Sequence, residues 1–162
     1  MNKVLKTFLL VVTGVSLLAL TGCVSSNDQQ LSVTLSNTLK GDTVQVDVAG
    51  IKQDQIGYYS NMQASQYWSL DSKIRNKLSK RTLLFYPGRP AAEVIPSNSP
   101  VWDLWDVNGD DYLLIAADLP PTVANSINWK LIIPMPYYWD LNFWSSRNGN
   151  FVVDTTGLTY VD

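Results

Sequence analysis

Histidine is absent from the 162-residue sequence, and cysteine occurs only once. Without an imidazole, this chain alone cannot form a Ser-His-Asp triad, a Cys-His dyad, a zinc site of the HExxH type or a histidine pH switch. A single thiol also excludes an internal disulfide and any zinc or redox site built on a CxxC pair. The commonest catalytic and metal-binding classes are therefore excluded before any motif is considered.

Charge is also scarce, since charged residues make up 16% of the chain against 46% for hydrophobic residues. Together with the length, this composition is typical of a single globular domain. What the sequence has in excess is aromatic residues, with six Trp and eight Tyr. Such residues favour strands and interfaces, so the composition predicts a β-rich protein with a binding surface.

Residues 1–22 have the pattern of an export signal. Lys3 and Lys6 give the chain a positive start, and an apolar run over residues 8–20 follows. This run is shorter than the roughly 20 residues that a helix needs to cross a bilayer. We therefore expect residues 1–22 to be cleaved and to lie outside the fold.

The end of this segment, Leu20-Thr21-Gly22 before the single cysteine Cys23, resembles the bacterial lipobox. The resemblance implies that Leu20, Thr21 and Gly22 are recognised by the signal peptidase and that Cys23 carries covalent lipid, the only added group expected. An Asp directly after the cysteine tends to retain such lipoproteins at the inner membrane, and Val24 stands there instead, which implies the outer membrane. The alternative is that Cys23 is an ordinary small residue of an apolar segment.

Cleavage leaves a polar lipidated tether, residues 23–30, and a domain, residues 31–162. The tether spans at most about 25 Å when extended, so the domain is expected to stay close to the membrane. With Lys3 and Lys6 removed, ten basic residues remain against 14 acidic ones, a net charge of −4. Nucleic-acid recognition depends on clustered positive charge, so we expect no nucleic-acid partner.

Period-two alternation predicts half-buried strands at residues 31–35 and 44–48, joined by a short connection that is consistent with an antiparallel pair. The run 112–117 is apolar on both faces, which favours a central strand, and Asn108-Gly109 before it is a hairpin signal. About eight strands in all predict a mainly β, two-sheet antiparallel sandwich. The strands expected after the second are residues 82–86, 101–107, 112–117, 129–133, 151–154 and 158–161.

Residues 54–80 have few β-branched side chains and predict one or two short helices inserted after the second strand. Leu70, Ile74 and Leu78 recur every four positions, as on the buried face of one helix. Five basic residues fall within residues 73–81, and we interpret them as the solvated surface of that helix in preference to a partner-binding patch.

No catalytic set is recognisable in the sequence. Residues 106–111 begin like a Ca²⁺ loop but lack its glycine and its bidentate glutamate, so a solvated hairpin turn is the better interpretation and no metal site is expected. Paired carboxylates for a hydrolytic mechanism could come from Asp103, Asp106, Asp140 or Glu93, but nothing in the sequence indicates that any two of them converge. We therefore expect a protein that is not an enzyme.

Aromatic residues offer the clearest binding candidates. Trp102 and Trp105 are three positions apart, which places them on opposite faces of a strand, with one ring in the core and one available outside it. The ring-rich stretch 134–144 contains Trp139 and Trp144. Exposed rings provide large contact area at low entropic cost, so Trp105, Trp139 and Trp144 are candidates for contacting a protein or a glycan.

Residues 111–118, followed after a turn by residues 128–133, resemble the second half of the TssJ-type outer-membrane lipoproteins of type VI secretion systems. Those proteins pair an apolar strand ending in Ala with a strand led by Trp-Arg, on a transthyretin-like sandwich that carries extra helices. Lys130 stands where that family usually has Arg. Asn37 and Gly41 are similar to the Asn and Gly of the family's first loop.

This resemblance implies a structural subunit, anchored in the outer membrane, that docks a periplasmic complex of the type VI secretion system. It also implies that the first loop, with Asn37, Lys40 and Gly41, helps to contact the periplasmic domain of an inner-membrane secretion subunit. The alternative function is a lipoprotein that binds cell-wall glycan or peptide through the three exposed Trp rings named above.

Overall fold

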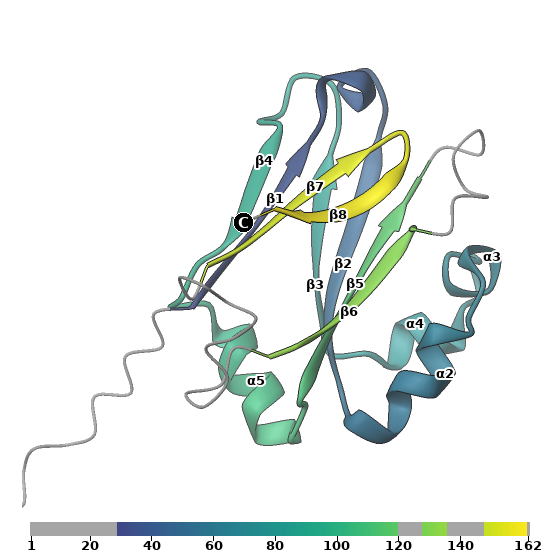
Figure 1. Ribbon diagram of the computed structural model, residues 1–162, viewed down its shortest axis with the longest axis vertical. Coiled ribbons are helices and arrows are strands. Elements are labelled where there is room, and N and C mark those ends of the chain that lie inside the picture. The colour runs from purple at the N-terminus through teal and green to yellow at the C-terminus, as the bar shows by residue number, and fades with distance from the viewer. Residues whose placement is uncertain (1–28, 120–127, 136–147, 162) are drawn as a thin grey trace, which may run out of the picture.

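The computed structural model of the protein describes residues 29–119, 128–135 and 148–161. Two four-stranded sheets, with strand orders β4-β1-β7-β8 (the β1 sheet) and β3-β2-β5-β6 (the β2 sheet), form a sandwich (Figure 1). The mainly β, two-sheet fold predicted from the sequence is confirmed. The strands are β1 (Gln30–Leu35), β2 (Val44–Ile51), β3 (Lys80–Phe85), β4 (Ala92–Ile95), β5 (Tyr112–Asp118), β6 (Lys130–Pro134), β7 (Asn148–Asp154) and β8 (Gly157–Val161).

The helical elements are short and gather mainly between β2 and β3, where the sequence predicts an insertion. None of the helices in the described ranges is long and apolar enough to cross a membrane. The elements are η2 (Asn37–Leu39), η3 (Gln53–Gln55), α2 (Ile56–Ser60), α3 (Ala64–Tyr67), α4 (Lys73–Lys77) and α5 (Pro100–Asn108). We call the segment from η3 to α4 the helical insertion.

The first two strands do not pair with each other, and that prediction is wrong. β1 lies between β4 and β7, and its pairing with β7 is parallel, whereas β2 lies between β3 and β5 in the other sheet. The connection of residues 36–43 therefore crosses from one sheet to the other, and its residue Leu39 is buried. Alternation identifies a strand with one buried face, but it does not say which strand will be its neighbour.

The strand predicted at residues 101–107 is the helix α5, and Asn108-Gly109 ends this helix instead of making a hairpin. Pro at the first helical position and Gly just past the end are the expected boundary residues of a helix. Gly109 has φ of +69°, and its N–H bonds the last carbonyls of the helix. Trp102 and Trp105 are both buried, because residues three apart share one side of a helix.

The centre of the β2 sheet agrees with the sequence prediction. β5 is paired along both edges, with β2 and with β6, and residues 113–117 are buried on both faces of the strand, as their apolar character predicts. The short edge strand β4 has no alternating run long enough to predict it. In the helical insertion, Ile74 and Leu78 pack against the core, but Leu70 is fully exposed because α4 begins only after its N-cap Ser72.

Candidate docking surface

The two ends of the sandwich differ in what they connect. The chain enters β1 at Gln30, and we call the end of the sandwich where β1 begins the anchor end, after the lipid anchor that the sequence predicts at Cys23. The end where β1 stops, which we call the distal end, carries the connection of residues 36–43, the β3–β4 turn and the β7–β8 turn (Figure 1). A partner approaching from the side opposite to the anchor end would meet these connections first.

The connection after β1 is held tightly at the distal end. Leu39 is buried, its N–H donates to Ser36 O at 3.1 Å, and the N–H of Asp42 donates to Leu39 O at 2.9 Å. The N–H of Ser36 donates to Val153 O at 2.9 Å, which ties the connection to β7. These contacts present three exposed residues that the sequence nominated for partner contact: Asn37, Lys40 and Gly41.

The β3–β4 turn lies at the same end and adds two residues that the sequence did not indicate. Pro87 and Gly88 occupy its centre, Gly88 has φ of +90° as a type II turn requires, and the N–H of Arg89 donates to Tyr86 O at 3.0 Å. Arg89 Nε also donates to Tyr86 Oη at 2.8 Å, and the guanidinium carbon lies 5.1 Å from the ring centroid. The turn therefore fixes an exposed cation against an aromatic ring.

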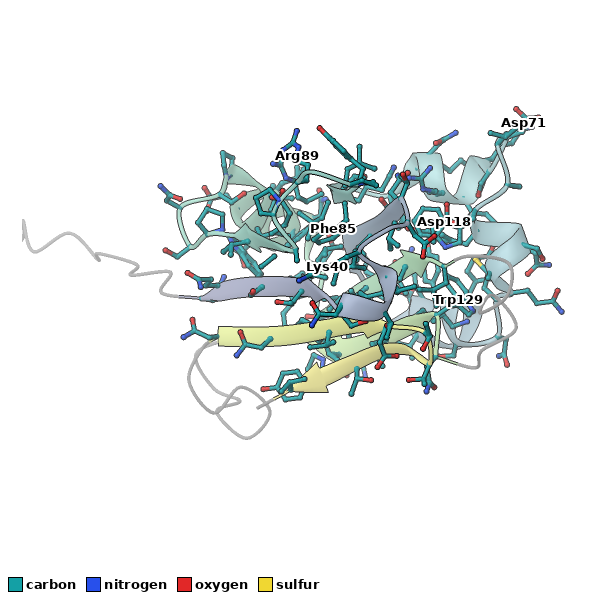
Figure 2. All side chains as sticks on the ribbon, turned by 90° about the horizontal axis from the view of Figure 1, so that it is seen from above. Lys40, Asp71, Phe85, Arg89, Asp118 and Trp129 are labelled. Carbon is teal, nitrogen blue, oxygen red and sulfur yellow. The ribbon has the colours of Figure 1, made fainter. Side chains whose placement is uncertain are left out.

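Between the connection of residues 36–43 and the β3–β4 turn lies an open hollow of about 270 Å³. Leu35 and Phe85 contribute apolar lining, while Lys40, Tyr86 and Arg89 supply polar and charged groups; Figure 2, which views the molecule from above, labels Lys40, Phe85 and Arg89. Two cations beside an apolar floor suit an acidic segment that carries an apolar side chain. We call Asn37, Lys40, Gly41, Tyr86 and Arg89 the distal surface.

A buried charge on the outer face of the β2 sheet holds the helical insertion in place. Asp47 of β2 is 0% exposed, and its carboxylate accepts hydrogen bonds from Arg75 Nε at 2.7 Å, Tyr67 Oη at 3.1 Å and Thr82 Oγ1 at 2.6 Å. Burial, and then the Asp47 charge, raise the pKa of Tyr67, while the hydrogen bond to Asp47 raises the pKa of Arg75. Both groups therefore keep their protons and act as donors to Asp47.

Aromatic rings complete this contact. The ring of Tyr67 lies 5.0 Å from that of Trp68 and 5.7 Å from that of Trp129, and the Arg75 guanidinium lies 4.6 Å from the Trp68 ring. Lys130 Nζ donates to the backbone carbonyl of Met62 in the helical insertion and lies 4.6 Å from the centroid of the Trp129 ring. Burial lowers the pKa of Lys130. The Arg75 side chain is engaged by Asp47 and by the Trp68 ring. The basic run of residues 73–81 is therefore not a uniform cationic patch on the surface.

Trp105 is not available to a ligand, and its nomination for partner binding is wrong. Its ring is 0% exposed, its Nε1 donates to Ser79 O at 2.8 Å, and it makes an edge contact with Trp102 at 5.1 Å. The strand assumed for this segment would have separated the two rings, whereas the helix buries both. Of the remaining nominated residues, Asn37, Lys40 and Gly41 are described above, and the others lie outside the described residues: Leu20, Thr21, Gly22, Cys23, Trp139 and Trp144.

The acidic run 106–111 is not a solvated hairpin turn as predicted. It comprises the end of α5 and the residues after it, and Asp110 within it is buried, which raises the pKa of its carboxyl group. Within residues 29–119, 128–135 and 148–161, no three acidic, His or Cys side chains gather in a way that would hold a metal ion.

The fold is a two-sheet β-sandwich with a short helical insertion, and known structures share that fold. No family model and no curated protein matches the chain. Serratia marcescens Lip, a membrane-bound component of the type VI secretion system, is 13% identical with a TM-score of 0.51, over 83% of this chain and 98% of that one. A chain of a type VI membrane complex is 11% identical with a TM-score of 0.54, over 83% and 97%.

The type VI secretion lipoprotein TssJ1 from Pseudomonas aeruginosa is 10% identical with a TM-score of 0.51, and the match covers 83% of this chain and 95% of that one. The chain therefore has the fold of the TssJ-type lipoproteins, and the resemblance predicted from the sequence is confirmed for the fold. Tyr86 and Arg89 were missed because the pairing assumed for the first two strands gave no reason to place the β3–β4 turn beside the first loop.

Proposed function

We propose that the protein is a structural subunit, anchored in the outer membrane through lipid on Cys23, that docks the periplasmic part of the type VI secretion membrane complex. The observation that carries this proposal is the position of the distal surface at the opposite end of β1 from the tether. The fold shared with type VI secretion lipoproteins supports the choice of complex.

The mechanism is mechanical. β1 leads straight from the tether to the first loop and is paired on both sides, with β4 and with β7, so it is a central strand of its sheet. The last residue of β1 is joined to the residues that follow the β3–β4 turn, because the N–H of Leu35 donates to Ala91 O at 2.6 Å. A load applied at the distal surface would therefore reach the lipid anchor through a rigid sheet.

The partner in this proposal is the periplasmic domain of an inner-membrane secretion subunit. Lys40 and Arg89 favour an acidic segment of that domain, and the floor of the hollow favours an apolar side chain within it. The carboxylate of Glu93 on β4 lies 3.9 Å from the Arg89 guanidinium, and an acidic segment of the partner would displace it or share the cation with it.

Site-specific crosslinking tests the docking face. A photoreactive residue at Lys40 is expected to crosslink to the inner-membrane secretion subunit in cells, whereas one at exposed Thr159 on β8 is not.

Reversing both charges, Lys40→Glu with Arg89→Glu, is expected to slow association with that subunit about tenfold, since charges at the edge of an interface act mainly on the association rate. Recovery of no secretion subunit with the unmodified chain would contradict the proposal.

Lipidation is tested separately. The chain is expected to incorporate a palmitate analogue and to sediment with the outer membrane, and Cys23→Ser is expected to abolish both, because no second thiol is present to accept lipid. An unlabelled wild-type chain, or a Cys23→Ser chain that still sediments with the membrane, would exclude the anchor.

A further inference from the structure

The helix α5 is apolar on two opposite sides. Trp102 and Trp105 bury one side in the sandwich, while Pro100, Leu104 and Val107 follow the spacing i, i+4, i+7 along the exposed side. Leu104 is 47% exposed and Val107 is 84% exposed. The outer side of a surface helix is normally polar, so this exposed apolar ridge marks a surface that something covers.

The ridge lies at the anchor end of the molecule. Ile95 at the end of β4 is paired with Leu31, the second residue of β1, and only residues 96–99 separate Ile95 from α5. The indole of Trp102 donates to Pro96 O at 2.9 Å, which holds the helix against this connection. Figure 1 accordingly shows α5 at the end of the sandwich where β1 begins.

The length of the tether identifies what covers the ridge. Residues 23–29 span at most about 25 Å, so a lipid on Cys23 holds this end of the domain within that distance of the bilayer. At such a short separation the lipid surface is present at high effective concentration, and a small apolar contact is enough to be populated. This step rests on the lipid anchor of the proposed function.

Charge distinguishes the kind of membrane contact. The exposed side of α5 carries Asp103 and Asp106 and no basic residue, so attraction to anionic lipid cannot drive the contact. We propose that Leu104 and Val107 insert shallowly between the lipids of the anchoring membrane and thereby turn the distal surface away from it. Shallow insertion of an apolar helix face at the headgroup boundary is the general mode of interfacial helices.

A fluorophore on a single introduced cysteine tests this contact. The native thiol is blocked by lipid, so Leu104→Cys provides the only free thiol, and Leu84→Cys on β3 provides a control with the same residue type and a matched exposure of 45%. Each full-length lipidated chain is labelled with nitrobenzoxadiazole and reconstituted into phosphatidylcholine vesicles. The label at 104 is expected to shift to shorter emission wavelength and to be quenched by lipid-borne nitroxide, unchanged by added salt; the label at 84 is not.

A second substitution links the signal to the ridge. Val107→Asp in the Leu104→Cys chain is expected to remove the shift while the chain still floats with the vesicles. A floating chain with no shift at 104, or with equal shifts at 104 and 84, overturns the inference and leaves the anchor intact. A short emission wavelength of the label at 104 in the Cys23→Ser chain, measured without vesicles, would show that protein rather than lipid covers the ridge. That result would also overturn the inference. If the chain with Cys23 intact is found to carry no lipid and does not float with the vesicles, the anchor itself is overturned.

Discussion

Asp47→Ala is expected to lower the free energy of unfolding by about 3–5 kcal/mol, the usual cost of breaking a buried ion pair by removing one partner. The substitution leaves Arg75, Tyr67 and Thr82 without the acceptor that their side chains share. Tyr67 is buried and cannot recover its hydrogen bond from water without movement of the helical insertion. The substitution should therefore also loosen the attachment of α3 and α4 to the β2 sheet.

Urea denaturation of the Cys23→Ser chain, with and without Asp47→Ala, measures this loss. Asp103→Ala is the matched control, since Asp103 is an exposed acid on α5, and its effect should remain within about 0.5 kcal/mol. Amide hydrogen exchange should show residues of the helical insertion losing protection before those of β5. A change below about 1 kcal/mol for Asp47→Ala would mean that the carboxylate does not hold the insertion.

Trp105→Ala is expected to cost about 3–5 kcal/mol, because it leaves a cavity where a fully buried indole stood. The ring loses its hydrogen bond to Ser79 and its edge contact with Trp102. It also packs so closely on β2 that a Cβ at Gly50 would lie 2.5 Å from its Cδ1, which explains why glycine stands there. This ring thus joins α5 to the sandwich, and its loss should release the helix.

Thermal unfolding monitored by circular dichroism tests this prediction, with Leu104→Ala on the opposite side of the same helix as the control. Leu104 is largely outside the core, so its truncation should cost no more than about 1 kcal/mol. Equal effects of the two substitutions would contradict the burial of Trp105. Addition of cell-wall glycan should leave the emission of Trp105 unchanged, since no sugar can stack on a buried ring.

The sequence determined those features that depend on local periodicity. Alternation located β1 and β2, and the apolar run of residues 112–117 located β5 and indicated its central position. Each of these patterns arises because the two faces of a strand alternate along the chain, so a few residues record whether one face or both faces are buried. The mainly β class and the helical insertion after β2 followed from the same local signals.

The identity of α5 was not determined in this way. A nine-residue segment with Trp at two positions three apart fits a strand with one ring inside and also fits a helix with both rings inside. The packing of the Trp105 indole against Gly50 decides between them, and that contact joins residues more than fifty positions apart in the sequence.

Only the tertiary structure decided which strands are neighbours, and with them the candidate site. Lys40 and Arg89 line one hollow because β1 pairs with β4 and not with β2, and Asp47 is buried because a distant segment supplies its donors. Both outcomes depend on contacts between residues that are far apart along the chain. A local hydrophobic pattern carries no information about such contacts, because every half-buried strand shows the same alternation whichever partner it takes.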